Sequence, residues 1–279
     1  MVLLEGKKTA NQIKEEIKTS VEALVKKGNR PPHLAAVLVG NDGASLTYVG
    51  SKVKSCQYVG FESTLLHLNE HTTEEELLQY IKTFNEDSKI DGYIVQLPLP
   101  LHIDANVILD AINPQKDADG LHPLNLGRLV TGQKAPRPCT PQAIVELLLR
   151  NEISLSGKDV TIIGRGLTVG RPLSILLSHR DINATVTVVH TGTRDLQSHT
   201  KKADVVIAAL GKAHFLHGAM VKPGVVAVDV GITRTARGLQ GDFHPNIAGV
   251  ASAYSPMPGG VGPMTRAMLL QNLVELAER

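Results

Sequence analysis

The sequence predicts an α/β protein with two domains, the second of them of the Rossmann type, and a C-terminal helix that packs back on the first. Short apolar runs rich in β-branched residues alternate with helical patterns along the 279 residues, as in parallel sheets covered by helices. Residues 157–172, GKDVTIIGRGLTVGRP, combine a buried strand, a glycine turn and a helix start. The length favours roughly two domains. We place the first at 1–118 with 264–279 and the second at 119–263.

The first half of the chain alternates three strand-like apolar runs with helical segments. Thr9 with Gln12, and Thr72 with Glu75, match the capping box that opens a helix. We therefore expect strands at 34–39, 62–67 and 93–96, and helices at 9–27, at 44–59, after Thr72 and at 105–112.

The second half follows a segment, 116–141, that is rich in turn residues and prolines and contains the expected change of domain. The chain closes with a glycine-proline loop and a long helix from about Thr265. Between them we expect a helix at 141–150 and strands at 160–163, 186–189, 205–209 and 225–230.

Composition excludes several classes of function. The formal net charge is +2, and aromatic residues make up 3% of the chain, without tryptophan. The sequence therefore offers neither the basic surface nor the stacking platform of a nucleic-acid-binding protein. No apolar run reaches the length of a membrane span, and the N-terminus lacks a signal pattern. Cys56 and Cys139 form no disulfide framework, and His122, His190 and His244 show no metal-ligand spacing. We expect a cytoplasmic protein without a metal, a membrane partner or a nucleic-acid partner.

The glycine turn after the strand at 160–163 indicates dinucleotide binding. Gly164, Gly166 and Gly170 would let backbone N–H groups approach a phosphate at a helix start. Their spacing is one residue longer than the common fingerprint, so the turn needs the support of its context. The second β-branched run, at 186–189, lies at a suitable distance.

The cofactor is expected to be NADP rather than NAD. No acidic residue ends the run at 186–189, where a carboxylate would repel a ribose phosphate. Arg165 and Arg194 carry guanidinium groups that could bind this phosphate in a bidentate manner. The alternative is that both are solvated loop arginines.

Polar side chains near the expected strand ends are candidates for the chemistry. Tyr48 and Lys52 are one helical turn apart and share a helix face, where a partly buried lysine beside a phenol can act as a general acid or base. Gln96 ends a strand at the edge where α/β sheets bind ligands, and its amide could bind a planar heterocycle. The alternatives are a solvated Tyr-Lys pair and a glutamine that satisfies the loop backbone.

Two loops complete the set of candidates. In KDADGLHP, Asp117 or Asp119 could accept hydrogen bonds from the N–C–N edge of a ligand. Asx-turn chemistry would explain either aspartate without a ligand, Asp117 in particular. The PGGVGP loop at 258–263 would allow backbone to approach a ligand closely, or it needs its glycines for structural reasons alone.

Six strings follow one another in the order YVGSK, VQLPLP, KDADGLHPLNLGRL, PCTPQAI, GRGLTVGRP and PMPGGVGPMT. Together they resemble the bifunctional methylenetetrahydrofolate dehydrogenase/cyclohydrolase family, essentially from one end of the chain to the other. The resemblance implies NADP-dependent oxidation of 5,10-methylenetetrahydrofolate to the methenyl compound and its hydrolysis to 10-formyltetrahydrofolate, in one-carbon metabolism. It also implies a cleft between the domains where folate and cofactor meet, and a homodimer formed through the cofactor domain.

The resemblance also assigns roles to residues. Lys52 matches the lysine of the hydrolytic step, and a neutral amine is favoured there because a protonated one would repel the methenyl cation. Asp119 matches the aspartate that holds the pterin. The expected catalytic residues are Tyr48, Lys52, Gln96 and Asp119. The expected substrate-binding residues are Tyr48, Gln96, Leu97, Asp119, Pro258, Gly259, Gly260, Val261 and Gly262. The expected cofactor-binding residues are Gly164, Arg165, Gly166, Thr191 and Ile232.

One position departs from the family pattern. Many members resemble G-R-S in the cofactor turn, where this chain has Gly166, so a hydroxyl that could bind the cofactor is missing. Two other classes of function stay open: a redox or folate sensor that keeps the fold, and an unrelated NADP-dependent dehydrogenase. The joint presence of Tyr48, Lys52, Gln96 and Asp119 argues against the sensor, and the unrelated dehydrogenase would be indifferent to folate.

Overall fold

The computed structural model describes residues 1–278, apart from the side chain of Ala44. The chain forms two compact units. Unit 1 comprises Met1–Asn11 and Thr140–Thr265, and unit 2 comprises Gln12–Cys139 and Arg266–Arg279.

This division differs from the expected boundaries at three segments, of which residues 264–265, expected in the first domain, belong to unit 1. Residues 1–11, expected in the first domain, belong to unit 1 because β1 (Val2–Leu3) pairs in parallel with β11 (Ala253–Ser255). Residues 119–139, expected in the second domain, belong to unit 2. The side-chain amide of Asn272 donates to the carbonyl of Arg137 at 2.9 Å and so ties this segment to the C-terminal helix.

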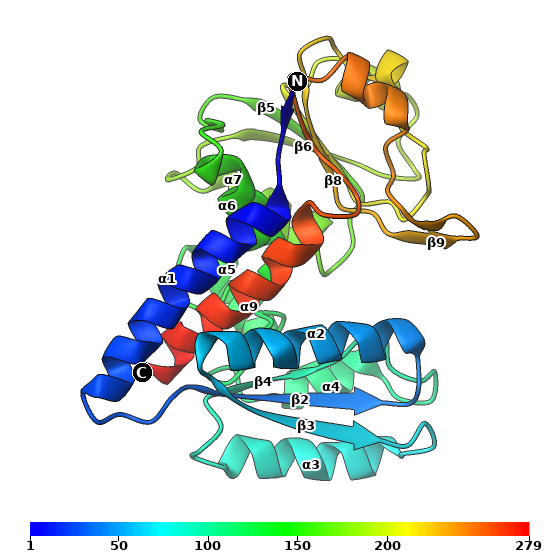
Figure 1. Ribbon diagram of the computed structural model, residues 1–279. Helices are drawn as coiled ribbons and strands as arrows, with labels where there is room; N and C mark the ends of the chain where they lie inside the picture. Colours follow the sequence, from blue (N-terminus) through cyan, green and yellow to red (C-terminus); the bar gives the residue numbers. More distant parts are fainter. Residues whose placement is uncertain (279) are drawn as a thin grey trace. The chain divides into compact units, whose positions relative to one another are not determined.

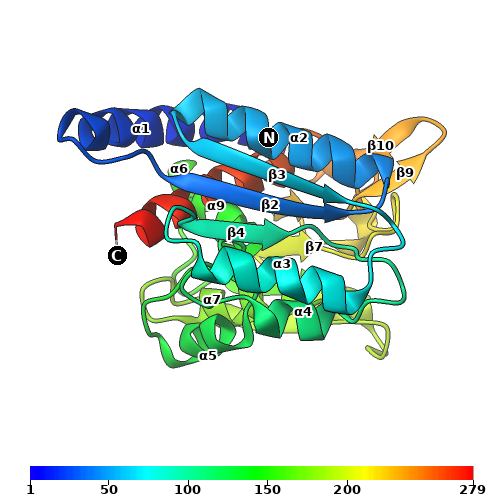
Figure 2. The ribbon, with the colours of Figure 1, turned by 90° about the horizontal axis from the view of Figure 1, so that it is seen from below.

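Unit 2 is built on a three-stranded parallel sheet in the order β3-β2-β4. Its strands, β2 (His33–Val39), β3 (Glu62–Leu68) and β4 (Gly92–Val95), confirm the three runs expected from the sequence. The central strand β2 has six consecutive buried residues, as expected of a strand covered on both faces. Figure 1 shows α2 (Gly43–Val59) on one face and α3 (Glu74–Glu86) on the other, and Figure 2 shows the three strands side by side.

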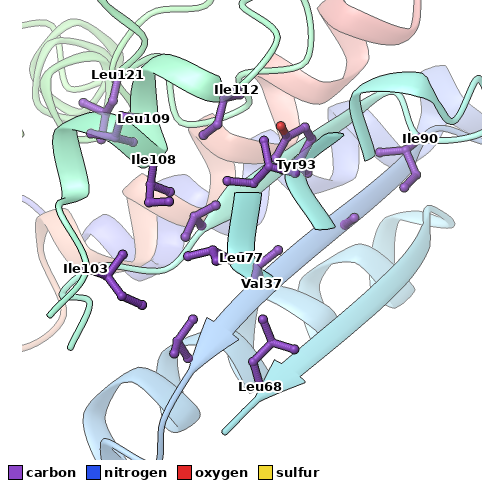
Figure 3. Packing of buried hydrophobic residues seen from close by; sticks show 14 residues of the cluster. Val37, Leu68, Leu77, Ile90, Tyr93, Ile103, Ile108, Leu109, Ile112 and Leu121 are labelled. Carbon is purple, nitrogen blue, oxygen red and sulfur yellow. The ribbon is translucent and has the colours of Figure 1, made fainter. Parts of the chain in front are cut away.

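The main core of unit 2 gathers side chains from the sheet, from α3 and from α4 (Ala105–Ala111). Figure 3 shows Val37 and Tyr93 of the sheet in one cluster with Leu77 and Ile108 of the helices. Tyr93 is fully buried, and its hydroxyl donates to Asn85 Oδ1 at 2.7 Å. The phenol therefore adds apolar area to the core without leaving a buried polar group unpaired.

The C-terminal helix α9 (Val261–Ala277) packs on β4. A Cβ at Gly92 would lie 2.9 Å from Leu276 Cδ1 and 3.0 Å from Leu273 Cδ1, so the close approach depends on glycine in the strand. This confirms the expected return of the C-terminal helix to the first domain. The helix begins at Val261 rather than near Thr265, because proline is tolerated in the first turn and the glycine-proline residues join the helix.

Two other helix starts differ from expectation. Helix α1 (Gly6–Lys26) begins before Thr9, whose hydroxyl donates to a carbonyl of the preceding turn and therefore caps nothing. Helix α3 is capped by Thr73 rather than Thr72. Thr73 and Glu76 exchange the reciprocal bonds of a capping box, a pattern that fits the sequence equally well one residue later.

Helix α5 (Pro123–Thr131) is not expected from the sequence, where its segment resembles a loop. The residues that suggest turns are its ends. The His122 ring accepts a hydrogen bond from Leu124 N at 3.0 Å, proline occupies the first turn, and Gly132 closes the helix with a φ of 70°.

Unit 1 contains a six-stranded sheet in the order β1-β11-β8-β7-β5-β6, in which every pair is parallel. Strand β5 lies between β6 and β7, so the chain reverses its direction of progress across the sheet at the carboxyl end of β5. Ligands bind at such switch points in open α/β sheets. The remaining strands are β5 (Asp159–Ile163), β6 (Thr185–Val189), β7 (Val205–Ala208), β8 (Val226–Asp229) and the hairpin β9 (Thr233–Thr235) with β10 (Gly238–Gln240). The helices are α6 (Cys139–Arg150), α7 (Gly170–Ser178), α8 (Leu196–Thr200), η1 (Gly218–Met220) and η2 (Pro245–Gly249).

Within residues 1–278, no helix combines the length and the apolar character needed to cross a bilayer. The same residues contain no group of three or more His, Cys, Asp or Glu side chains arranged to hold a metal ion. Cys56 and Cys139 are buried free thiols.

Candidate active site

Lys52 lies on α2, which follows β2 after a short turn. Asp42 caps this helix by accepting a hydrogen bond from Ser45 N at 2.8 Å. Lys52 is only 4% exposed, and its Nζ lies 4.7 Å from the centre of the Tyr48 ring, within the range of a cation–π contact. The alternative of a solvated surface pair is therefore wrong for Lys52.

Gln96 follows β4 and faces the lysine. Its Oε1 lies 3.4 Å from Lys52 Nζ, while its Nε2 donates to the carbonyl of Leu97 at 2.6 Å. The second bond holds the amide with its oxygen toward the amine. Gln96 thus satisfies the loop backbone and faces Lys52 at the same time. Leu97 packs against the core of unit 2.

Asp119 approaches Lys52 from a third segment. Its Oδ2 lies 4.0 Å from Lys52 Nζ, and its side chain is 26% exposed against 4% for the lysine. The carboxylate is therefore open to a ligand while the amine is shielded from solvent.

Asp117 organises the loop that carries Asp119. It is 2% exposed and accepts hydrogen bonds from Gly120 N at 3.0 Å, His122 N at 2.8 Å and Asn125 Nδ2 at 2.9 Å. Burial raises the pKa of this carboxyl, while the hydrogen bonds stabilise its ionised form. These contacts explain Asp117 without a ligand, as the Asx-turn alternative expects.

The negative charge of Asp119 also acts on Tyr48 and Cys139. Burial, and secondarily Asp119, raise the pKa of Tyr48, which therefore stays a phenol that can donate a hydrogen bond. The same two causes raise the pKa of Cys139 well above its ordinary value. Its neutral thiol donates to the carbonyl of Ala118 at 3.5 Å. Cys139 is not among the expected site residues. The PCTPQAI string that contains it is one of the six that carry the family resemblance, and this is the sequence signal that could have placed it near the site.

The glycine turn of unit 1 follows β5 at the switch point. Gly164 has a φ of 120°, and a Cβ there would lie 2.4 Å from Ala209 O. A Cβ at Gly170 would lie 2.1 Å from Gly164 O, so the turn closes only with glycine at both positions. A turn this tight, leading into the N-terminus of α7, fits the pyrophosphate of a dinucleotide. Around Gly166 the space is open, since no atom lies within 4 Å of a Cβ there.

Arg165 extends from this turn toward the end of β6. Its Nη1 lies 3.4 Å from His190 Nε2, and the arginine is exposed. The guanidinium is therefore beside the strand end where this fold binds the ribose of a dinucleotide. Thr191, which follows His190 in the sequence, is exposed, and Ile232, after β8, is 57% exposed.

The 258–262 loop, whose last two residues begin α9, also belongs to unit 1. Gly259 has a φ of 101°, and its carbonyl accepts a hydrogen bond from Lys7 N at 3.1 Å. A Cβ at Gly6 would lie 1.8 Å from Gly260 O, so the start of α1 approaches the loop backbone closely. These contacts support the structural account of the glycines, and the binding of substrate by Pro258, Gly259, Gly260, Val261 and Gly262 stays a prediction.

Two family models cover most of the chain. Residues 4–119 match the tetrahydrofolate dehydrogenase/cyclohydrolase catalytic domain, and residues 138–279 match the tetrahydrofolate dehydrogenase/cyclohydrolase NAD(P)-binding domain. The chain belongs to the tetrahydrofolate dehydrogenase/cyclohydrolase family.

Similar proteins of this family agree with both matches. The bifunctional protein FolD of Flavobacterium johnsoniae is 54% identical over 282 residues, which are 98% of this chain and 96% of that protein. The structure of the bifunctional FolD enzyme from Campylobacter jejuni has a TM-score of 0.96 at 46% identity and covers 100% of this chain and 99% of its own. The Trypanosoma brucei dehydrogenase-cyclohydrolase, solved with NADP and an inhibitor, has a TM-score of 0.94 at 35% identity, with 100% and 98% covered. The predicted family and α/β fold are confirmed.

In this member of the family, the structure brings four expected catalytic residues together. Tyr48, Lys52, Gln96 and Asp119 meet in unit 2, within or at the end of the part that matches the catalytic domain. The glycine turn and the 258–262 loop lie in unit 1, within the part that matches the NAD(P)-binding domain.

Proposed function

We propose that this chain oxidises 5,10-methylenetetrahydrofolate with NADP and hydrolyses the methenyl product to 10-formyltetrahydrofolate. The observation that carries the proposal is the place of Lys52, a buried amine 3.4 Å from Gln96 Oε1 and 4.0 Å from Asp119 Oδ2. A shielded amine between an amide oxygen and a carboxylate open to a ligand is suited to proton transfer beside a bound substrate. Membership of the family supports the folate substrate, and the NADP in the T. brucei relative supports the cofactor.

In the hydrolytic step, Lys52 acts as the general base. Water adds to the methenyl carbon, and the neutral Nζ accepts the proton that the water loses as its oxygen bonds to that carbon. The hydroxyl on this carbon then loses its proton to solvent as it becomes the formyl carbonyl, the bond from the carbon to one ring nitrogen breaks, and that nitrogen takes the proton from Lys52. One proton is released overall, and the amine is neutral again. The cationic methenyl group favours a neutral amine beside it, because two adjacent positive charges repel.

The other three side chains orient the reactants. Gln96 Oε1 holds the amine in place, because the bond of its Nε2 to Leu97 fixes the amide. The carboxylate of Asp119 accepts paired hydrogen bonds from the N–C–N edge of the pterin. Tyr48, whose raised pKa keeps it protonated, donates a hydrogen bond to the substrate or to the attacking water.

In the oxidative step, NADP when bound accepts the hydride from the methylene carbon. The chain contributes binding and orientation. The turn at Gly164 and Gly166 offers backbone N–H groups to the phosphates, and Arg165 binds the ribose phosphate that distinguishes NADP from NAD. The exposed Thr191 would add a hydroxyl near Arg165, and the exposed Ile232 would contact the nicotinamide side of the cofactor.

Unit 2 would then be the folate-binding unit and unit 1 the NADP-binding unit, with the 258–262 loop adding backbone contacts to the substrate. A homodimer through unit 1 is part of the proposal. It is supported by the place of β6 at the outer edge of the six-stranded sheet, since an edge strand can pair with another chain. The buried free thiols of Cys56 and Cys139 support a cytoplasmic location.

Initial rates with 5,10-methylenetetrahydrofolate test the proposal. Reduced nicotinamide and methenyl product are followed separately, with NADP and NAD in parallel. We expect NADP to be preferred by about tenfold or more, as one charge-assisted hydrogen-bonded contact allows, with little accumulation of the methenyl compound. The absence of reduction with either cofactor would contradict the function, and equal rates with both would contradict the role of Arg165.

A further inference from the structure

Unit 1 buries two carboxylates that the proposed chemistry does not use. Asp229 ends β8 and is 1% exposed, and Asp242 follows the β9–β10 hairpin and is 0% exposed. A carboxylate withdrawn from water is costly unless it is hydrogen-bonded. The donors that these two aspartates bind show which part of the unit they organise.

Asp242 accepts hydrogen bonds from three consecutive backbone N–H groups. Its Oδ2 accepts from Leu210 at 2.6 Å and from Gly211 at 3.3 Å, and its Oδ1 accepts from Lys212 at 2.7 Å. These residues follow β7 at the carboxyl edge of the sheet, where α/β folds bind ligands. Successive N–H groups that converge on one point form a nest for an anion. Here the carboxylate of the chain itself fills the nest and fixes the loop.

The loop that Asp242 fixes lies against the glycine turn. Ala209 N donates to Ile163 O at 2.9 Å, and a Cβ at Gly164 would lie 2.4 Å from Ala209 O. A shift of the chain at 209–210 would therefore press on the turn or open a gap behind it. On the other side, a Cβ at Gly231 would lie 2.1 Å from the Asp242 carboxylate. The Asp242 carboxylate therefore contacts both the segment that follows β7 and the segment that follows β8, beside the glycine turn at Gly164.

Asp229 in turn holds Asp242. Its Oδ1 accepts from Asp242 N at 2.8 Å, its Oδ2 accepts from Phe243 N at 3.0 Å, and the Tyr254 hydroxyl provides a further hydrogen bond. A Cβ at Gly241 would lie 2.0 Å from Asp229 Oδ2, so the two segments approach this closely only with glycine. The two aspartates form an interlocked pair that runs from the end of β8 to the loop after β7.

We propose that Asp242 is a positioning residue for the NADP step. It acts through the exit loops of β7 and β8, which it holds in the arrangement that accepts the cofactor. It takes no part in the hydrolytic step, whose residues lie in unit 2. The inference rests on the proposed function in taking NADP as the ligand.

The test compares NADP binding in the parent chain, Asp242→Asn and Asp204→Asn. Asp242→Asn keeps the side-chain volume but turns an amide NH₂ toward backbone donors. Asp204→Asn is the matched control. Asp242 binds the loop after β7, whereas Asp204 precedes β7 at its amino end, where its carboxylate pairs with Lys222 at 2.6 Å. Calorimetric titration gives the Kd for NADP, and steady-state assays give KM and kcat. Methenyltetrahydrofolate supplied directly reports hydrolysis.

For Asp242→Asn we expect the Kd and KM for NADP to rise about tenfold or more, as the loss of a buried hydrogen bond to a charged group implies. The kcat at saturating NADP and the rate of hydrolysis should stay near the parent values, and Asp204→Asn should match the parent throughout. Gly231→Ala provides a second variant, because its methyl would displace the carboxylate without removing it. It should raise the Kd for NADP in the same way.

Equal NADP affinity in the parent, in Asp242→Asn and in Gly231→Ala would overturn the inference. A parallel loss of oxidation and hydrolysis in Asp242→Asn would also overturn it, because Asp242 would then support stability alone. A parent chain that does not bind NADP would overturn the proposed function and this inference together, so the two failures are distinguishable.

Discussion

The substitution Asp117→Asn tests whether a buried carboxylate sets the loop that carries Asp119. In the parent, Oδ2 of Asp117 accepts from two donors, His122 N and Asn125 Nδ2, and Oδ1 accepts from Gly120 N. An asparagine can keep its oxygen on the two-donor side, but its NH₂ then faces Gly120 N. The loss of one buried hydrogen bond to a charged group costs about 1.5–3 kcal/mol.

Relief of desolvation offsets part of this loss, because burial raises the pKa of Asp117 and so disfavours its charge. We therefore expect a net fall in the free energy of unfolding of about 1–2 kcal/mol. Asp119 should shift with the loop and raise the KM for both folates by about tenfold, which corresponds to about 1.4 kcal/mol.

Urea denaturation and steady-state kinetics with the methylene and methenyl compounds measure the two effects. Asp110→Asn is a suitable control, because Asp110 is an exposed carboxylate on α4 in the same unit. A variant at Asp117 with unfolding free energy within about 0.5 kcal/mol of the parent, and with unchanged KM values, would refute the reasoning.

Two further predictions concern unit 1. Gly166→Ser introduces the serine hydroxyl of the G-R-S pattern described above for the family's cofactor turn. The open space around position 166 should accept this side chain. The KM for NADP should fall about twofold to tenfold through one added hydrogen bond, and an unchanged or higher KM would count against this. Burial and the charge of Asp242 raise the pKa of Asp229 to about 7 from 3.8, so its folded carboxyl holds a proton more tightly than the unfolded one. The Asp229 carboxyl therefore makes its full contribution to the free energy of unfolding below the pKa that it has in the unfolded chain. This contribution, up to about 4 kcal/mol, is lost as the pH rises through the folded pKa near 7. Denaturation across this range should show a steeper decline in the parent than in Asp229→Asn, and identical slopes would refute the assignment.

The strands could be predicted because their signal is local. Runs such as residues 34–39 and 160–163 are apolar and β-branched over their full length, and β2 and β5 occupy them. Helix ends are less certain, because side chains at neighbouring positions can make the same bond. Thr72 and Thr73 both fit a capping box, and only the folded chain shows that Thr73 forms it. Helix α5 was not predicted, because the residues at its ends, His122, Pro123 and Gly132, are also typical of turns.

The candidate site could be predicted where residue type and position suffice. Tyr48 and Lys52 share a helix face by spacing, but the burial of Lys52 depends on segments far away in the sequence, such as those that carry Gln96 and Asp119. Turn chemistry favoured a structural role for Asp117, and the resemblance assigned the pterin to Asp119. The physical difference appears only in the folded chain, where Asp117 is buried among donors and Asp119 stays open. Asp242 gave no signal, since its partners are backbone N–H groups of a distant loop.

Hydrolysis of methenyltetrahydrofolate by Lys52→Ala tests the role of Lys52 most directly. Lys54→Ala is the matched control, because Lys54 is exposed on the same helix. Removal of the general base should slow hydrolysis about a hundredfold or more, while NADP reduction with the methylene compound continues and the methenyl product accumulates. Hydrolysis by Lys52→Ala at the rate of the parent and of Lys54→Ala would contradict the assignment of Lys52 as the base.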